Sequence, residues 1–264
     1  YGIEDLDTEI KQLEVAKRLN EEHAVDVIST FMGAHAVPMA YKHDPEEFVQ
    51  KIIQEMIPVV AEKNLASFCD VFCEHGVFTI DQTRRILMEG RKWGLDPKLH
   101  ADEIESIGGA ELAAELRCIS ADHLVGASDE GIRKMAEAGV VATLLPGTSF
   151  NLQSGKHARA RFMIDSGLPV AVSTDYNPGS CPTENLQLVM SLASLILKMT
   201  PEEVLTAVTM NGAAALGLEK EIGSIEVGKK ADLVIFDSEN LEYIIYHFGI
   251  NHTDIVIKNG KIVY

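Results

Sequence analysis

The chain is predicted to fold as an α/β protein, a (β/α)8 barrel of the TIM type without its first strand or strands, followed by a small C-terminal β-sandwich portion. Short apolar segments alternate with amphipathic helical segments over most of the sequence. Polar side chains suited to catalysis stand where the apolar segments end, as in barrels of this type. The last part of the chain changes to the apolar–polar alternation of antiparallel strands. A doubly wound sheet could hold as many strands, but it fits the polar strand ends less well.

Composition limits the possible partners. The 264 residues, 46% of them hydrophobic, suit one large α/β domain with at most a small appendage. With 40 acidic and 23 basic residues the net charge is −17, which repels nucleic acid and anionic membranes. No apolar run approaches the ~20 residues of a membrane helix, and no cleavable signal is evident, so we predict a cytoplasmic protein. The four cysteines include no C-x-x-C pair and are expected to be reduced thiols.

The first element is an amphipathic helix over residues 5–19. Its apolar positions recur at three- and four-residue steps, at Leu6, Ile10, Leu13, Ala16 and Leu19. Such a stripe needs a strand to pack on, and none precedes it here. We therefore expect the chain to be the later part of a longer polypeptide.

Six strands and their connecting helices follow in order. The strand segments are AVDVISTFMGAH, ASFCDVFCE, DPKLHADE, CISADHL, VVATLLPG and PVAVSTD. The helical segments between them are residues 45–64, 79–94, 108–117, 128–139 and 158–167. Short strands that are apolar on both faces, each followed by a helix, indicate parallel pairing with the helices outside.

The C-terminal part begins with a helix over residues 201–215, with Pro201 in its first turn. Residues 222–237 and 253–264 then alternate apolar with polar positions and contain Gly-Lys and Asn-Gly turns, typical of antiparallel hairpins. The predicted division is residues 1–216 for the barrel and 217–264 for the strands of the small β-sandwich domain.

Reactive side chains stand at the ends of most predicted strands: His35, Glu74, His75, His100, Glu103, His123 and Asp175. A lone histidine at such a position is usually a hydrogen-bonded structural residue. Their succession on neighbouring strands favours an active site instead.

His100 and Asp175 are plausible metal ligands, because imidazole nitrogen and carboxylate oxygen suit a hard or borderline divalent cation. Two protein ligands are too few for a complete site. A leading strand that supplied further histidines would complete it.

Glu103 and His123 could handle protons beside that metal. Glu103 stands three residues after His100 and suits proton transfer to and from a substrate. His123 could orient or deprotonate a water molecule, or polarise a carbonyl. The structural alternative makes Glu103 a partner of the next helix N-terminus and His123 a core histidine.

The loop after Asp175 contains Asn177, Pro178, Gly179 and Ser180. Such a turn exposes backbone N–H groups beside the carboxylate and could bind a polar ligand. A plain surface turn explains the same composition, but not its position directly after Asp175.

These motifs resemble the amidohydrolase superfamily, and the likeness runs from Tyr1 to Tyr264. It is carried by LHADE (99–103), SADHL (120–124), STDYNPGSCPTE (173–184), MNGAAALGL (210–218) and IGSIEVGKKADLVIFD (222–237). The segments FMGAHAVP and STDYNPGSCP resemble the branch that opens the ring of 4-imidazolone-5-propanoate to N-formimino-L-glutamate, in histidine degradation.

The resemblance implies a hydrolase with one zinc or iron ion, a small-molecule substrate and a possible homodimer. By position it implies His100 and Asp175 as metal ligands, Asp175 also being catalytic, and Glu103 and His123 as the proton-handling pair. The substrate contacts that it implies are Tyr1, His35, Glu103, Asn177, Gly179 and Ser180.

One departure concerns what precedes Tyr1. The family's H-x-H metal pair and a substrate-contacting arginine lie before it, so we expect this chain alone to bind metal weakly and not to turn over. The alternatives are another amidohydrolase, such as a nucleobase or aromatic deaminase, or a non-catalytic module.

Overall fold

A computed structural model describes residues 3–264 of the chain. The backbone forms two compact units, Tyr1–Val140 (unit 1) and Val141–Tyr264 (unit 2). Among the helices of the described residues, none combines the length and apolarity needed to cross a membrane.

Unit 1 contains four parallel strands in the order β1-β2-β3-β4, as the sequence predicts. Their bounds are Thr30–Ala34 (β1), Phe68–Cys73 (β2), Asp96–Ala101 (β3) and Ser120–His123 (β4). The register places Phe72 opposite His100, and His100 opposite Asp122. The carboxyl ends of these strands therefore meet at one edge of the sheet.

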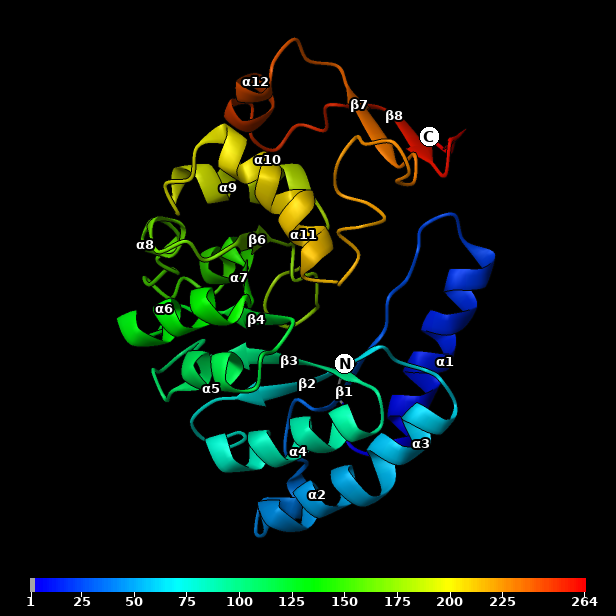
Figure 1. The fold of residues 1–264 in the computed structure, drawn as a ribbon, viewed down its shortest axis with the longest axis vertical. Helices are drawn as coiled ribbons and strands as arrows, with labels where there is room; N and C mark the ends of the chain where they lie inside the picture. Colours follow the sequence, from blue (N-terminus) through cyan, green and yellow to red (C-terminus); the bar gives the residue numbers. More distant parts are fainter. Residues whose placement is uncertain (1–2) are drawn as a thin grey trace. The chain divides into compact units, whose positions relative to one another are not determined.

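The helices of unit 1 precede, connect or follow its strands along the chain (Figure 1). They are α1 (Leu6–Glu22), η1 (Met39–Tyr41), α2 (Pro45–Lys51), η2 (Ile52–Met56), α3 (Ile57–Glu62), α4 (Ile80–Lys92), α5 (Gly109–Glu115) and α6 (Asp129–Ala138). Helix α4 packs on β2 and β3, and it begins at a capping box formed by Thr79 and Gln82. The predicted helices of this unit are confirmed.

The helix predicted over residues 45–64 contains one irregular turn. A π-helical turn, η2, separates α2 from α3. Pro58 stands in the first turn of α3 and has no N–H to donate to a carbonyl in the preceding turn. A wider turn accommodates this missing hydrogen bond.

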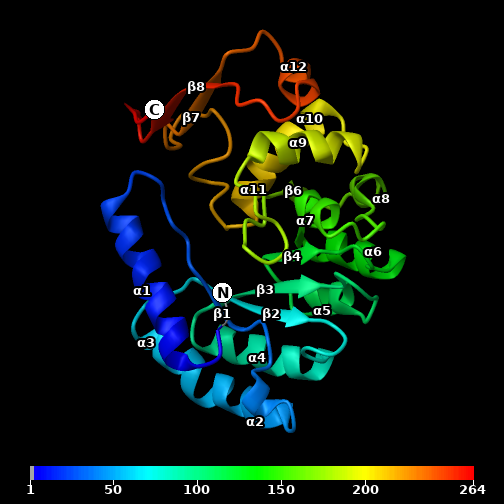
Figure 2. The ribbon, with the colours of Figure 1, turned by 180° about the vertical axis from the view of Figure 1, so that it is seen from behind.

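Helix α1 packs against the first strand. Figure 2 shows α1 beside α3, and Lys63 Nζ lies 3.1 Å from Glu14 Oε1 across this contact. On the inner face of α1, Leu13 and Glu9 are buried. Glu9 Oε1 accepts the N–H of Met32 in β1 at 2.8 Å, which attaches the helix to the strand.

Unit 2 begins with the parallel pair β5 (Val141–Leu144) and β6 (Val170–Val172), also as predicted. Its helices are α7 (Pro146–Asn151), α8 (Ala160–Asp165), α9 (Leu186–Leu195), α10 (Pro201–Val208), α11 (Met210–Ala214) and α12 (Leu241–Tyr246). The prediction of a single helix over residues 201–215 was wrong in one respect. The observed helix is interrupted at Thr209, whose φ of −120° and ψ of −86° are not helical.

A separate antiparallel sheet follows, as predicted, in the order β7-β8-β9. Its strands are Leu233–Phe236 (β7), Thr253–Lys258 (β8) and Lys261–Ile262 (β9), and the Asn-Gly turn at 259–260 joins the last two. No strands flank Gly228, where a hairpin was predicted. There the Lys230 N–H binds the Glu221 carbonyl at 2.8 Å, so the segment closes as a loop. The domain division at residues 216 and 217 stays a prediction.

All four cysteines are free and buried. Cys69, Cys73 and Cys118 belong to unit 1, and Cys181 belongs to unit 2. The reduced state expected for these thiols stays a prediction.

Candidate functional site

Four aromatic rings meet at the carboxyl ends of β1 to β4. His35 directly follows β1, Phe72 lies in β2, His100 in β3, and His123 ends β4. The centroid of the His100 ring lies 4.9 Å from that of His35 and 5.2 Å from that of His123. Three histidines predicted from separate strands therefore form one cluster in unit 1.

His100 is held by a carboxylate that the sequence analysis did not identify. Asp70 in β2 is 2% exposed, and its Oδ1 lies 2.6 Å from His100 Nδ1. If Nδ1 donates its proton to this carboxylate, Nε2 is the ring nitrogen that carries the lone pair a metal would need. The only sequence signal for Asp70 was an acidic residue inside the apolar run FCDVFC.

Asp70 and His100 also belong to a wider polar cluster. Ligand atoms of Asp70, His100 and Asp122 all lie within 4.8 Å of one another. Ser120 Oγ donates to Asp122 Oδ1 at 3.1 Å and accepts from Lys98 Nζ at 2.9 Å. The ammonium group of Lys98 is itself buried, so acidic and basic groups compensate each other inside the unit.

Glu103 lies beside His123, as expected for a proton-handling pair. Glu103 Oε1 is 3.6 Å from His123 Nδ1, and the His123 side chain is only 5% exposed. Burial, with a further contribution from His100 and His35, lowers the pKa of His123 well below its ordinary value. His123 is therefore a neutral imidazole at pH 7.

The backbone on both sides of Glu103 is fixed by buried acids. Asp102 Oδ1 accepts the N–H groups of residues 107, 108 and 109, and its Oδ2 accepts that of Ala110. Glu74 is 1% exposed, and its Oε2 accepts the N–H of Ile104 at 2.9 Å. The helix-capping role considered for Glu103 thus belongs to Asp102.

His35 is also neutral near pH 7. Burial, with a smaller contribution from His100, lowers the pKa of His35 to about 4. The resemblance implies a substrate contact for His35. The neutral ring can offer a hydrogen bond to a substrate, but not a positive charge.

Asp175 lies just after β6 in unit 2, where it was predicted. Its φ of 51° places it in the left-handed region, and its Oδ2 accepts Thr148 Oγ1 at 2.5 Å. Thr148, from α7, carries no recognisable sequence signal for this contact. It fixes one oxygen of the carboxylate.

The loop after Asp175 is closed by the side chain of Asn177. Asn177 Oδ1 accepts the N–H groups of Gly179 and Ser180 at 2.9 and 2.7 Å. Asn177 Nδ2 donates to the Asp175 carbonyl and to Ser180 Oγ, both at 2.8 Å. The expectation that this turn offers those backbone N–H groups to a ligand was therefore wrong, because the loop itself uses them.

The predicted site residues form two groups. Unit 1 brings together His35, His100, Glu103 and His123. Unit 2 brings together Asp175, Asn177, Gly179 and Ser180. Tyr1 lies outside the described residues. The roles of all nine residues stay predictions.

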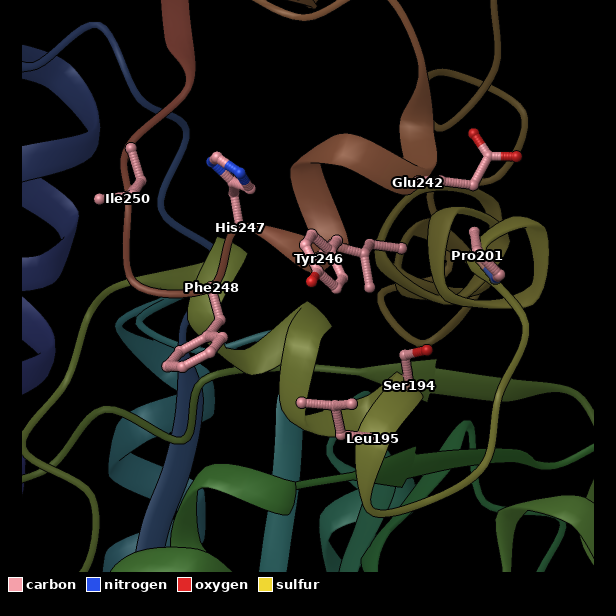
Figure 3. Close-up of a pocket in the computed structure, with 9 residues that line it drawn as sticks. Ser194, Leu195, Pro201, Glu242, Tyr246, His247, Phe248 and Ile250 are labelled. Carbon is pink, nitrogen blue, oxygen red and sulfur yellow. The ribbon is translucent and has the colours of Figure 1, made fainter.

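A pocket of about 610 Å³ in unit 2 contains none of these residues. Figure 3 shows it lined mainly by apolar side chains from α9 and from the end of α12 onwards, including Leu195, Tyr246 and Phe248. Its lining includes the titratable residues Glu242 and His247, and neither belongs to the cluster at the strand ends.

Comparison with known proteins gives relatives over the whole chain. The chain is 64% identical to the imidazolonepropionase of Alkaliphilus oremlandii, 60% identical to that of Geobacillus kaustophilus and 56% identical to that of Bacillus velezensis. Each match covers all of this chain and 62% of the relative. The chain thus spans about three fifths of the length of the curated relatives it matches.

Solved structures share the fold at low sequence identity. An adenosine deaminase from Xanthomonas campestris with bound zinc matches with a TM-score of 0.73 and 22% identity, over 95% of this chain and 63% of that one. A variant of atrazine chlorohydrolase from Arthrobacter aurescens, complexed with zinc and atraton, matches with a TM-score of 0.64 and 17% identity, over 81% of this chain and 55% of that one.

The model of the Amidohydrolase family matches residues 6–263, which is nearly the whole chain. The parallel strand–helix repeat, the separate antiparallel sheet and the similar solved structures agree with this match. The chain therefore belongs to the amidohydrolase family.

Proposed function

We propose that the polypeptide carrying this chain is a metal-dependent hydrolase that opens the ring of 4-imidazolone-5-propanoate to N-formimino-L-glutamate. The observation that carries the proposal is the cluster of His35, His100 and the buried His123, with Glu103 beside it. The relatives named imidazolonepropionase, at 56–64% identity, support this choice of substrate. Because the chain spans 62% of their length, the activity is proposed for the longer polypeptide.

We propose that His100 and Asp175 would hold one zinc or iron ion. Imidazole nitrogen and carboxylate oxygen suit such a cation, and a proton on Nδ1 of His100, shared with Asp70, would put the metal-binding lone pair on Nε2. When bound, the ion would supply Lewis acidity, which makes water acidic enough to ionise near neutral pH. The two solved structures that contain zinc share the fold alone and do not decide between the metals.

Glu103 and His123 would handle protons. The Glu103 carboxylate, 3.6 Å from Nδ1 of the neutral His123, favours the tautomer with its proton on Nδ1. Nε2 of His123 is then an acceptor that can orient or deprotonate the attacking water. As Nε2 of His123 takes the water's proton, its Nδ1 proton can pass to Glu103. Glu103 would then give that proton to the departing ring nitrogen as the C–N bond breaks, so that one C–O bond replaces it.

Substrate binding is proposed for Tyr1, His35, Glu103, Asn177, Gly179 and Ser180. Since His35 is neutral near pH 7, it would bind the substrate by hydrogen bonding. The closed loop at 177–180 would then act through its fixed shape and side-chain atoms. The resemblance implies that an arginine preceding Tyr1 would bind the negatively charged propanoate.

The test uses a joined polypeptide, in which this chain is fused to the part of the Alkaliphilus oremlandii relative that lies outside the matched region. The products that this polypeptide releases are then identified. We expect N-formimino-L-glutamate from the imidazolone, no ammonia from aromatic amines, and no turnover by the chain alone. Release of ammonia only, from an aromatic amine, would indicate a deaminase instead.

Asp175→Asn is expected to abolish turnover of the joined polypeptide and to leave its melting temperature nearly unchanged. An asparagine oxygen can still accept from Thr148 Oγ1, so the loop keeps that hydrogen bond. A large loss of stability would instead give Asp175 a structural role. A homodimer and a cytoplasmic location stay predictions, and sedimentation would measure the first.

A further inference from the structure

We propose that Asp70 is a positioning residue for His100: by accepting a hydrogen bond from Nδ1, it fixes the ring and the tautomer in which Nε2 carries the lone pair that a metal would bind. The inference rests on the proposed function only in taking His100 as a ligand. Nothing in the sequence motifs assigns Asp70 a role.

The contact is short and built from rigid elements. His100 Nδ1 and Asp70 Oδ1 are 2.6 Å apart, and their side chains are 13% and 3% exposed. Phe72 of β2 pairs with His100, so Asp70, two residues before Phe72, lies on the same face of β2 and further from the carboxyl end. The Nδ1 edge of the His100 ring therefore faces Asp70, away from the carboxyl end of the strands.

The carboxylate of Asp70 lies among other polar groups. Lys98, two residues before His100, points to the same face of β3. Its Nζ lies 4.9 Å from the centre of the Phe68 ring and 2.9 Å from Ser120 Oγ. The polar groups of this cluster therefore lie around the carboxylate on its own face of the sheet, and the contact with His100 holds its position.

Asp122 provides a matched comparison within the same cluster. It lies opposite His100 on β4, and its ligand atom is within 4.8 Å of those of His100 and Asp70. Its Oδ1 accepts from Ser120 Oγ. Replacing either aspartate with asparagine removes one negative charge, but only Asp70 has the 2.6 Å contact with Nδ1.

Nitrogen-15 NMR of the metal-free chain tests the pairing directly. Long-range ¹H–¹⁵N correlations report which ring nitrogen carries a proton, and His100→Gln identifies the His100 signals among the nine histidines. We expect a proton on Nδ1 in the native chain, and partial or complete transfer to Nε2 in Asp70→Asn, whose amide can also donate. An unprotonated Nδ1 in the native chain would overturn the proposal.

Zinc affinity, measured by competition with a chromophoric chelator, gives a second readout that needs no substrate. Partners of this kind affect metal affinity by about 10- to 100-fold, so we expect a loss of this size in Asp70→Asn and a smaller one in Asp122→Asn. Equal losses would show that only charge matters and would overturn the positioning role. Because the chain alone is expected to bind metal weakly, the affinities are measured in the joined polypeptide. If that polypeptide binds no zinc, the proposed metal site fails, whereas the NMR result still decides the pairing.

Discussion

The side chain of Glu9 is buried, and its two carboxyl oxygens differ in their hydrogen bonding. Oε1 accepts the N–H of Met32, whereas Oε2 has no hydrogen-bond partner among the described residues. Burial raises the pKa of Glu9 from its ordinary 4.5 to about 7, although the Met32 hydrogen bond opposes this shift. The native protein therefore holds a proton here that the unfolded chain has already released above pH 5.

The stability of the protein is expected to fall as the pH rises from about 4.5 to 7 because of Glu9. Over this range the native state keeps a proton that the unfolded chain has lost, so the stabilisation is fully present at low pH and is lost as the pH rises through about 7. A rise of the pKa from 4.5 to about 7 corresponds to at most about 3.5 kcal/mol, at about 1.4 kcal/mol per pH unit. Urea unfolding of the native chain and Glu9→Gln at several pH values measures the difference.

In Glu9→Gln this part of the pH dependence should disappear, because glutamine keeps an oxygen for the Met32 N–H without a titrating proton. Glu14→Gln is the control on the exposed face of the same helix. If Glu9→Gln and the native chain change in parallel with pH, Glu9 does not titrate as described.

Glu74 is expected to hold the loop that carries Glu103. Glu74→Ala leaves the Ile104 N–H without its acceptor, so it should cost about 1–3 kcal/mol of stability and speed hydrogen exchange at that amide. Hydrogen exchange followed by NMR measures the effect. The exposed neighbour Glu105→Ala is the control, and an equal increase in that variant would exclude a specific role for Glu74.

The sequence indicated the side chains at the strand ends but not the groups that orient them. His35, His100 and His123 could be inferred because parallel strands bring their carboxyl ends together. Asp70 lies 30 residues before His100, and Thr148 lies 27 before Asp175. Contacts over such distances depend on register and side-chain direction, which the pattern of one sequence does not contain.

At the level of elements, the six strands were predictable because they are short, apolar on both faces and bounded by polar residues. Helix α9 was not predicted, since the segment LQLVMSLASL is apolar almost throughout and lacks a clear amphipathic pattern. The break at Thr209 was also missed. Its backbone angles depend on how α10 and α11 pack, not on a proline or glycine at the break.

Helices α5 and α6 pack closely at Gly131. A Cβ on Gly131 would lie 2.7 Å from Ala110 Cβ in α5, which is too close for any real contact. We therefore expect Gly131→Ala to destabilise the protein by about 1–3 kcal/mol, despite the better helix propensity of alanine. Thermal unfolding measures this loss.

Gly212 in α11 supplies the control, since a Cβ there would meet its nearest atom, the Ala207 carbonyl oxygen, at 3.5 Å. Gly212→Ala should leave the melting temperature unchanged or raise it. If both variants lose the same stability, close packing is not the cause of the Gly131 effect.

At the scale of the whole chain, the net charge of −17 should slow the approach of an anionic substrate. Added salt shortens the Debye length from about 30 Å at 0.01 M to about 8 Å at 0.15 M and screens this repulsion. If the proposed function holds, kcat/KM of the joined polypeptide should rise severalfold over that range. The neutral amide of the substrate is the control, and a fall with salt for the acid would show that local positive charge dominates.

The four buried thiols make the native chain its own reporter of transient opening. Burial raises the pKa of Cys73 to about 11 and that of Cys118 to about 12, and it raises the pKa values of Cys69 and Cys181 as well. An alkylating reagent should therefore modify them almost entirely in molecules that have opened locally or globally. Mass spectrometry of the labelled peptides would measure the rate of this opening separately at three sulfur atoms of unit 1 and one of unit 2, without any engineered probe.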